Sequence, residues 1–353
     1  MVMGLPQIEI VFRTLAASAI ERSERGVISL ILRDTKTAVK EYKSIDEVKD
    51  ADFSANNIKH IKEAFYGTPS KVIAVPIAAD GPVSEALTVL KGMYWNYLAM
   101  PEATAADVTD IVAFIKGQRT LKKKIFKAVL PNATGPDHEG IINFTTTGIK
   151  MKDGTDMTTE AFCVRLASVF AGLPFTRSAT YYVFPDVASI QEIDDPDEAI
   201  DSGQLILVND GKKVKIGRAV NSLVTFTPEK HREFSKIRIV EILDMVLEDI
   251  RETFENEYIG KYENSFQNKL MFVTVVNAYF QVLVIENVLE REGENRARIN
   301  GPAQKLYLES MGKDTSEMSE GQILRANTGS NVFLAGNLSV LDAMEDLKFD
   351  IAI

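Results

Sequence analysis

The chain has 353 residues, more than one ordinary hydrophobic core accommodates, so two or three domains are expected. Its composition, 45% hydrophobic and 25% charged, is that of a soluble globular protein. The net charge of −10 argues against a general nucleic-acid binder, and the single cysteine excludes an internal disulfide.

The chain opens with an amphipathic segment, residues 6–13. Ile8, Ile10 and Phe12 recur at every second position, which predicts a strand with one apolar face. A small-residue and charged stretch separates it from a second predicted strand at 27–32. A terminal strand with an apolar face needs a sheet to join, in its own chain or in another. The residues before it lack a secretory signal pattern, so synthesis in a cytoplasm is expected.

Helix and strand signals alternate from residue 42 to residue 126, and further strand and helix signals follow up to the helical pair. We expect helices at 46–66, 82–99, 104–119 and 158–173, and strands at 71–77, 125–130, 141–149, 181–184 and 221–226. Residues 96–100 fit either a strand or the end of a helix. Asp210-Gly211, between the predicted strands 204–209 and 213–219, is the strongest short hairpin signal. The alternation predicts an α/β layer with some parallel pairing.

Residues 233–290 predict two long helices joined by a short turn. Apolar residues recur at steps of three and four along the first helix, Gly260 suits its C-terminal cap, and Asn264 or Ser265 can cap the second. The second helix is apolar over most of its circumference, which predicts burial in the core of a C-terminal domain. A membrane span is the competing interpretation of 270–285, but this run is shorter than the about 20 apolar residues that a span needs.

The rest of the chain is polar at 291–300, with a predicted helix at 302–311, a loop or fraying helix at 313–321 and a strand at 331–337. The last segment alternates Leu347, Phe349, Ile351 and Ile353 with other residues, so the chain begins and ends with an amphipathic strand.

No catalytic, cofactor or metal site is predicted. The three histidines, His60, His138 and His231, are far from one another, and Cys163 reads as a small buried hydrophobe. Phosphate-binding glycine motifs and a nucleophile elbow are missing. The acidic run at 194–201 lacks the ligand spacing of a calcium loop. Enzymatic function therefore has no positive evidence.

Five segments, in this order, carry a family resemblance. They are GLPQIEIVFRTLAASAIERSERGVISLILRD, AFCVRLASVFAGLPFTRSAT, GQLILVNDGKKVKIGRAVNSLVTF, FSKIRIVEILDMVLEDIRETFENEYIGKYENS and LKFDIAI. Together they resemble contractile tail sheath proteins of the short type, found in myophages and phage-tail-like bacteriocins of Gram-positive bacteria.

The resemblance implies a mixed α/β and α+β fold. An outer α/β domain would have a subtilisin-like layer arrangement, without a protease prediction because no Gly-Thr-Ser-x-Ala motif accompanies it. A C-terminal core domain would hold the helical hairpin and a small sheet. The implied domains are an arm strand and joint at 1–25, the α/β domain at 26–230, the core domain at 231–338, and a linker and arm strand at 339–353.

The resemblance also implies that both terminal strands complete the small sheet of a neighbouring subunit. The implied arm residues are Gln7, Ile8, Glu9, Ile10, Val11, Phe12, Arg13, Leu347, Lys348, Phe349, Asp350, Ile351, Ala352 and Ile353. The charged joints at 13–26 and 338–346 would absorb rotation during contraction. Three basic residues follow the hairpin: Arg291, Arg296 and Arg298. Either they face the inner tube, as the resemblance allows, or they belong to an ordinary solvated loop.

The implied partners are other copies of the chain in hexameric rings or a six-start helix, the tail tube protein, the baseplate and the tail terminator, without nucleic acid, membrane or cofactor. The protein would be made in a bacterial host cytoplasm and become part of a virion tail or of a released phage-tail-like particle. Contraction would drive the tube through the target envelope. The alternatives are an α/β hydrolase-type enzyme that uses the strands only to oligomerise, and a non-contractile tail adaptor or terminator.

Overall fold

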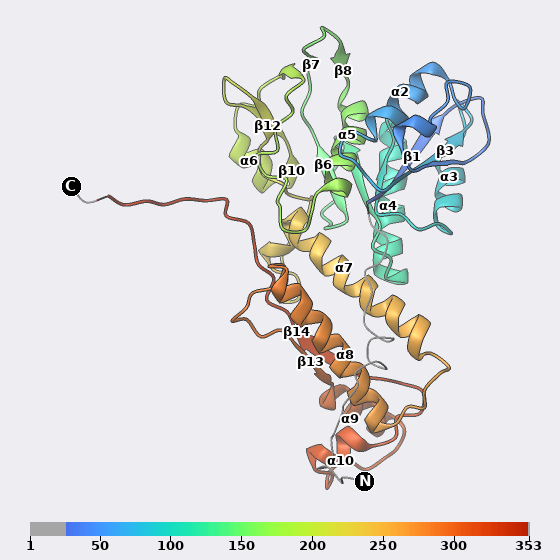
Figure 1. Cartoon of the computed structure of the whole chain (residues 1–353), viewed down its shortest axis with the longest axis vertical. Coiled ribbons are helices and arrows are strands. Elements are labelled where there is room, and N and C mark those ends of the chain that lie inside the picture. The colour runs from blue at the N-terminus through green and yellow to red at the C-terminus, as the bar shows by residue number, and fades with distance from the viewer. Residues whose placement is uncertain (1–25, 352–353) are drawn as a thin grey trace, which may run out of the picture. The chain divides into compact units, whose positions relative to one another are not determined.

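A computed structural model describes residues 26–351 of the chain (Figure 1). Within these residues, one compact unit runs to Asp244 and resumes at Asp342, and the other covers Met245–Leu341. We call them the α/β unit and the C-terminal unit. The boundary predicted at 230/231 differs from this division, which falls inside a helix, and each unit is described by itself.

A seven-stranded sheet forms the centre of the α/β unit, in the order β10-β6-β5-β4-β1-β3-β2. Its strands are β1 (Val27–Arg33), β2 (Lys40–Tyr42), β3 (Lys71–Ile77), β4 (Tyr97–Ala99), β5 (Lys127–Pro131), β6 (Ile141–Phe144) and β10 (Gln204–Leu205). All neighbours pair in parallel except β2, which lies antiparallel to β3 at one edge. The inner strands β1 and β5 are buried along almost their whole length and are mostly apolar, because a parallel sheet is covered on both faces.

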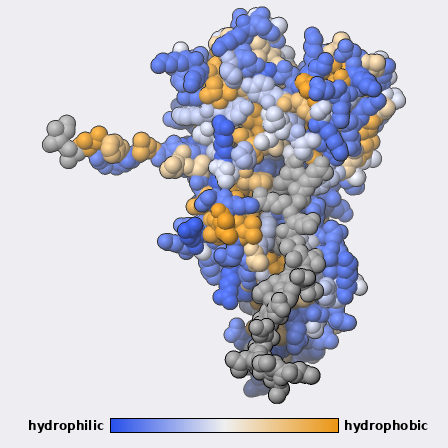
Figure 2. All heavy atoms as spheres, viewed as in Figure 1, coloured by the Kyte–Doolittle hydropathy of each residue, from blue (hydrophilic) through white to orange (hydrophobic). Residues whose placement is uncertain are grey.

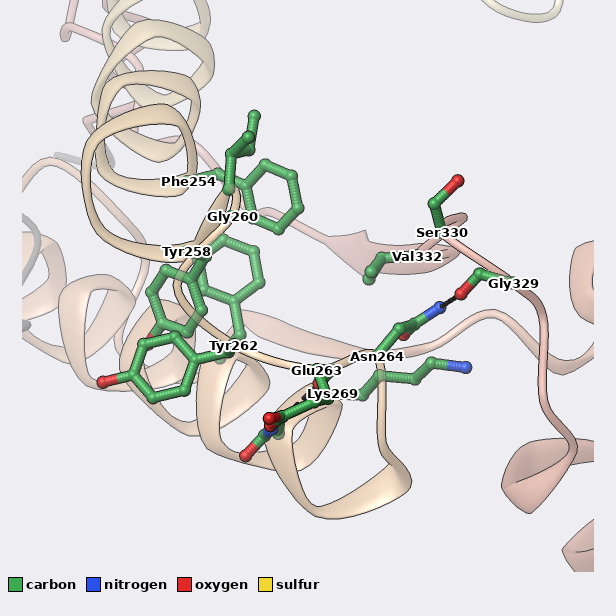
Figure 3. Close-up of a pocket in the computed structure, with 13 residues that line it drawn as sticks. Phe254, Tyr258, Gly260, Tyr262, Glu263, Asn264, Lys269, Gly329, Ser330 and Val332 are labelled. Atoms are coloured by element: carbon green, nitrogen blue, oxygen red, sulfur yellow. Dashed lines mark hydrogen bonds between the residues drawn. The ribbon is translucent and has the colours of Figure 1, made fainter.

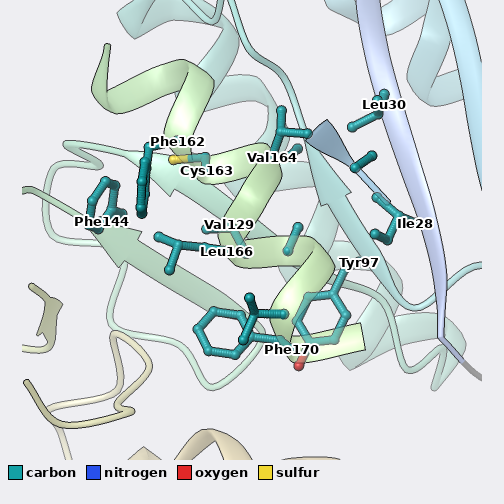
Figure 4. Packing of buried hydrophobic residues seen from close by; sticks show 14 of the residues in the cluster. Ile28, Leu30, Tyr97, Val129, Phe144, Phe162, Cys163, Val164, Leu166 and Phe170 are labelled. Atoms are coloured by element: carbon teal, nitrogen blue, oxygen red, sulfur yellow. The ribbon is translucent and has the colours of Figure 1, made fainter. Parts of the chain in front are cut away.

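Helices cover the two faces of this sheet. They are α2 (Ala55–Glu63), α3 (Val83–Leu90), α4 (Ala105–Lys122) and α5 (Thr159–Gly172). Successive side chains of β1 alternate between the layers: Ile28 and Leu30 pack in the core that α2 and α5 cover, and Ile31 packs in the core beneath α3 and α4. Figure 4 shows the first core, where Phe162 and Leu166 of α5 meet side chains of the strands.

Local sequence signals fix the ends of these helices. Thr104 and Asp107 form a reciprocal capping box at the start of α4, and the Thr158 side chain accepts from the Ala161 N–H at the start of α5. Gly67 is required where the loop after α2 passes α5, because a Cβ there would lie 2.2 Å from the Ser168 carbonyl oxygen. The loop can therefore approach α5 closely, and the Gly67 N–H donates to Ser168 Oγ at 2.5 Å.

Smaller elements complete the α/β unit. They are the strands β7 (Ile149–Met151), β8 (Asp156–Met157), β9 (Val187–Ser189), β11 (Leu207–Asn209) and β12 (Val214–Ile216), the helix α6 (Pro196–Asp201), and the 3-10 turns η1 (Ile45–Glu47) and η2 (Arg232–Ser235). The predicted hairpin at Asp210-Gly211 is confirmed, since β11 and β12 pair antiparallel around it and Gly211 has a φ of 82°.

The C-terminal unit is built on the predicted helical hairpin, which is confirmed. Its elements are the later part of α7 (Ile237–Thr253), a π-helical turn η3 (Phe254–Tyr258), α8 (Phe266–Ile285), β13 (Arg296–Ile299), α9 (Gly301–Ser310), α10 (Glu320–Arg325) and β14 (Leu334–Asn337). Gly260, with a φ of 74°, turns the chain, and Ser265 caps α8 by accepting from the Asn268 N–H. The first turns of α7, up to Asp244, belong to the α/β unit.

The helix α8 is long and apolar enough to cross a membrane, and half of it is buried within the structure. Its buried face includes Phe272, Val276, Tyr279 and Leu283. This burial favours the predicted core helix over a span.

Several predicted elements differ from the structure. The helix expected at 46–66 is confined to Ala55–Glu63, and the one at 82–99 ends at Leu90 so that 97–99 can join the sheet as β4. No strand forms at 221–226, and 181–184 contributes only a single bridge at Val183. The strand β13 lies in the stretch expected to be an irregular polar loop.

Candidate assembly surfaces

The C-terminal segment carries uncovered apolar side chains. Neither helix nor strand is assigned to residues 347–351, and the exposed fractions of Leu347, Phe349 and Ile351 are 90%, 73% and 69%. Figure 2 shows the apolar residues along this segment. An extended segment with an uncovered apolar face is what an unpaired strand presents. Residues 352–353 and the predicted N-terminal arm, residues 7–13, lie outside the described residues.

The C-terminal unit contains a two-stranded antiparallel sheet of β13 and β14. One edge of this sheet is filled by a side chain of α8, because Asn277 Oδ1 accepts from the Ala297 N–H at 2.7 Å and Asn277 Nδ2 donates to the Ala297 carbonyl oxygen at 3.1 Å. The amide thus occupies both backbone groups that Ala297 directs outward from β13. A further strand therefore cannot form hydrogen bonds with Ala297 on that side of β13.

Within residues 26–351, the opposite edge of the sheet is unpaired at Gly336. Ala297 faces Gly336 in the register, and Ala297 directs its backbone groups away from β14, so the two form a non-hydrogen-bonded pair. Gly336 therefore directs its own N–H and C=O away from β13. Gly336 is exposed, and within residues 26–351 we find no hydrogen bond on that side of it. The outer edge of β14 can receive a strand.

The three arginines predicted to face a tube lie at or just before β13. Arg296 and Arg298 are exposed on one face of β13, alternating with the buried Ala297 and Ile299, and Arg291 is exposed in the bend that precedes the strand. Arg298 Nη1 lies 3.8 Å from Glu294 Oε1, a surface contact that contributes little to stability. The structure therefore brings two of the three arginines onto one exposed face.

A cavity of about 570 Å³ opens beside the turn between α7 and α8 (Figure 3). Tyr258, Tyr262 and Phe272 line one wall. Lys269, only 2% exposed, donates from Nζ to Thr328 Oγ1 at 2.9 Å and to Gln304 Oε1 at 3.3 Å. Burial lowers the pKa of Lys269.

A buried ion network holds the start of α7 on the sheet. Arg119 donates to both carboxylate oxygens of Asp244 at 2.9 Å, and Lys127 Nζ donates to Asp244 at 2.9 Å and lies 2.8 Å from Glu241 Oε1. Burial alone would raise the pKa of Asp244, but Lys127 and Arg119 hold it below its usual range. The network lies where β4 and β5 begin, whereas ligands of parallel α/β sheets bind at the carboxyl ends of strands. Its role is therefore structural.

His138 and Cys163 both lie in buried surroundings. Burial lowers the pKa of His138 to about 4, and its Nδ1 accepts from the Gly140 N–H at 3.0 Å. Cys163 is fully buried in α5, which raises the pKa of its thiol well above the usual value. Within residues 26–351, no group of three His, Cys, Asp or Glu side chains could hold a metal ion.

Comparison with known proteins identifies the family. Residues 77–222 match the phage tail sheath protein central domain, and residues 229–353 match the phage tail sheath C-terminal domain. The chain is also 39% identical to the tail sheath protein of Clostridium phage phiCD119, over 98% of each chain. The chain belongs to the phage tail sheath family. The sheath chain is thus a structural subunit of a contractile tail sheath, as its sequence predicts.

Solved structures share the fold of the sheath chain. The helical sheath of the anti-feeding prophage in its contracted state aligns over 99% of both chains, with a TM-score of 0.72 and 12% identity. The sheath tail protein of Desulfitobacterium hafniense aligns over 78% of the sheath chain and 90% of its own length, with a TM-score of 0.69 and 15% identity. At these identities the likeness shows the fold alone, with the mixed α/β content that the sequence predicts.

Sequence reasoning missed two features of the sheath chain that bear on assembly. Asn277 interrupts an apolar helix, and that interruption was the available signal for a backbone partner. The strand β13 had a signal too, because Ala297 and Ile299 alternate with Arg296 and Arg298, but a short alanine makes a weak apolar position.

Proposed function

We propose that sheath subunits polymerise by strand exchange, with Gln7–Arg13 and Leu347–Ile353 entering the β13–β14 sheet of neighbouring subunits. The observation that carries this proposal is the uncovered face of Leu347, Phe349 and Ile351, with exposed fractions between 69% and 90%. Burying three such side chains against another chain is favourable by about 1.5–3 kcal/mol each. The main-chain ladder adds strength, and the alternating side chains fix the register.

The first incoming strand pairs with the outer edge of β14. Asn277 already fills the edge of β13 at Ala297, whereas Gly336 directs its N–H and C=O away from β13 and has no partner among residues 26–351. In this arrangement residues 1–25 and 339–353 are connecting arms, and the two compact units are the bodies that they join. The main sheet, covered by helices on both faces, is compatible with the subtilisin-like layer arrangement that the resemblance implies.

The polymer surrounds the tail tube as hexameric rings or a six-start helix and shortens when the baseplate triggers it. Contraction then drives the tube through the target envelope, with strand pairs maintained while the bodies move. The tail terminator closes the other end. The exposed face of Arg296 and Arg298, with Arg291 beside it in sequence, is the proposed contact with the tube. Extended particles that still assemble on tubes after all three charges are reversed to glutamate would eliminate this contact.

Two matched variants of the full-length protein test strand exchange. Phe349→Ser with Ile351→Ser removes the apolar face of the C-terminal segment, and Lys348→Ser with Asp350→Ser changes the other face by the same number of residues. Negative-stain electron microscopy should show tubes for wild type and for the Lys348/Asp350 variant, but soluble subunits for the Phe349/Ile351 variant. Emission from the buried Trp95 verifies that each variant is folded.

The same images separate the alternatives. Tubes from the Phe349/Ile351 variant would refute the role of the C-terminal arm. Closed small oligomers from every sample would favour an enzyme that merely oligomerises, and single rings would favour an adaptor or terminator.

A further inference from the structure

Residues 342–346, which we call the acidic segment, lie against the α/β unit immediately before the proposed arm. Glu345 is the most buried acid of the segment, with a side chain 7% exposed. Its Oε1 accepts from Thr180 Oγ1 at 2.6 Å and from Ser178 Oγ at 3.0 Å. A carboxylate that accepts hydrogen bonds from two hydroxyl groups in a nearly closed site is held in a defined position.

Two basic side chains complete the contact. Arg218 donates from Nη2 to Asp346 at 2.5 Å, and its Nε lies 3.8 Å from Glu345 Oε2. Lys236 pairs with Asp342 and lies 3.9 Å from Glu345 Oε2. All three acids of the segment are therefore placed against two cations of the α/β unit.

Polar contacts dominate this attachment. Met344, in the middle of the segment, is fully exposed, and the backbone of residues 342–346 takes no part in a helix or strand. The side chains of Arg218 and Lys236 are 33% and 27% exposed, so dissolved ions can reach them. At 1 M salt the screening length falls to about 3 Å, which weakens such contacts.

We propose that Ser178, Thr180, Arg218 and Lys236 form a releasable latch for the acidic segment. With the latch closed, the free part of the chain begins at Leu347. With the latch open, it begins at Asp342, which adds five residues and up to about 17 Å of reach. The joint at 338–346 is expected to absorb rotation during contraction. With the latch closed, its second half is held against the α/β unit.

The latch gives the sheath chain a reserve of connecting length. An arm that remains paired with a neighbour while subunits move needs slack, and opening the latch supplies it without unfolding either unit. This use in the polymer rests on the proposed strand exchange, whereas the latch itself does not. The two can therefore fail separately.

Spin labels on the full-length protein test the latch. Cys163 is fully buried and stays unlabelled in the folded chain, so Met344→Cys gives one label within the acidic segment and Lys348→Cys gives one beyond it. In the Phe349→Ser, Ile351→Ser background, which keeps the subunits unassembled, we expect slow motion of the label at 344 and fast motion at 348 at 20 mM NaCl. At 1 M NaCl the label at 344 should become as fast as the label at 348.

Charge-neutral variants provide the matched comparison. Glu345→Gln should release the label at 344 at 20 mM NaCl, with about a ten-fold or greater fall in the ratio of closed to open latch. Asp350→Asn removes one acid from the exposed arm and should leave the label at 344 slow. Arg218→Gln tests the same latch from the other side if Glu345→Gln fails to fold, as judged by Trp95 emission.

Fast motion of the label at 344 at 20 mM NaCl, with all four latch residues and Glu345 unchanged, would overturn the latch, and so would slow motion in a folded Glu345→Gln or Arg218→Gln protein. These readings need no tubes. Loss of the latch in a chain whose unaltered arm still forms tubes would leave strand exchange standing, and a working latch in a chain whose unaltered arm forms no tubes would contradict strand exchange alone.

Discussion

Replacing Asp244 by asparagine should destabilise the α/β unit strongly. The Asp244 side chain is 6% exposed and accepts three hydrogen bonds of 2.9 Å from Arg119 and Lys127, whose side chains are 10% and 2% exposed. Asparagine keeps the volume but removes the charge, leaving two buried cations with less compensation. Removing one partner of a buried ion pair costs about 3–5 kcal/mol. Because Lys127 also pairs with Glu241 at 2.8 Å, we expect the lower end, about 3 kcal/mol.

Urea unfolding followed by tryptophan emission measures this loss. Trp95 is the only tryptophan of the chain, is fully buried in the α/β unit and stacks on Phe126 with ring centroids 3.9 Å apart. With a urea slope of about 2–3 kcal/mol per M, the midpoint should fall by about 1–1.5 M. The Phe349→Ser, Ile351→Ser background prevents polymerisation from adding to the apparent stability.

The matched control is Asp201→Asn, which removes an ion pair with Arg232 at the surface of the same unit. Those two side chains are 70% and 74% exposed, so the expected loss is about 0–1 kcal/mol. The pKa of Asp244 lies below its unfolded value, so its contribution is present at pH 7 and is lost as the pH falls below about 4. Equal midpoints for the Asp244 and Asp201 variants would refute the reasoning.

Three further predictions concern single positions. Because the pKa of His138 is lowered to about 4, the folded chain binds fewer protons than the unfolded chain between that pH and about 6.5, so its stability should fall as the pH falls through this window. His138→Asn should make the urea midpoint depend less on pH between pH 7 and pH 4. An unchanged pH dependence of the midpoint would contradict the assignment. Gly336→Ala places a Cβ 2.9 Å from the Arg296 carbonyl oxygen and should loosen the β13–β14 sheet by about 1–3 kcal/mol in amide hydrogen exchange, whereas Gly321→Ala, with no atom within 4 Å, should be neutral or stabilising by up to about 1 kcal/mol. Cys163 should react with a thiol reagent only in urea, and rapid reaction of the native chain would show that its burial is incomplete.

The sequence predicts the elements whose patterns are long or strongly marked. The helical hairpin was predicted because apolar residues repeat over many turns, and the Asp210-Gly211 turn because its dipeptide demands that geometry. The strand β4 is ambiguous in the sequence because its three residues, 97–99, are too few to show a period. Residues 97–99 form a strand because they pair with β1 and β5 in the parallel sheet, and such long-range pairing cannot be seen in a local sequence pattern.

The assembly features divide in the same way. The alternating pattern identifies the apolar residues of the C-terminal segment, and the structure shows them exposed. Their partner, a neighbouring subunit, is proposed. The open edge at Gly336 could not be predicted, since it depends on where an amide from α8 meets β13. The sequence predicts only a charged joint at the acidic segment. Its contacts with Arg218 and Lys236 could not be predicted, because these bases lie about a hundred residues away in the chain.

The return of the chain to the α/β unit has a consequence for biosynthesis. The acids of residues 342–346 leave the ribosome about 100 residues after Asp244, which at 5–20 residues per second is roughly 5–20 s later. The main sheet can form during that interval, while the exposed segment that follows the acids is still unmade. A nascent subunit can therefore fold its α/β body before the apolar C-terminal segment exists, and it cannot recruit a neighbouring nascent chain through that segment during the interval.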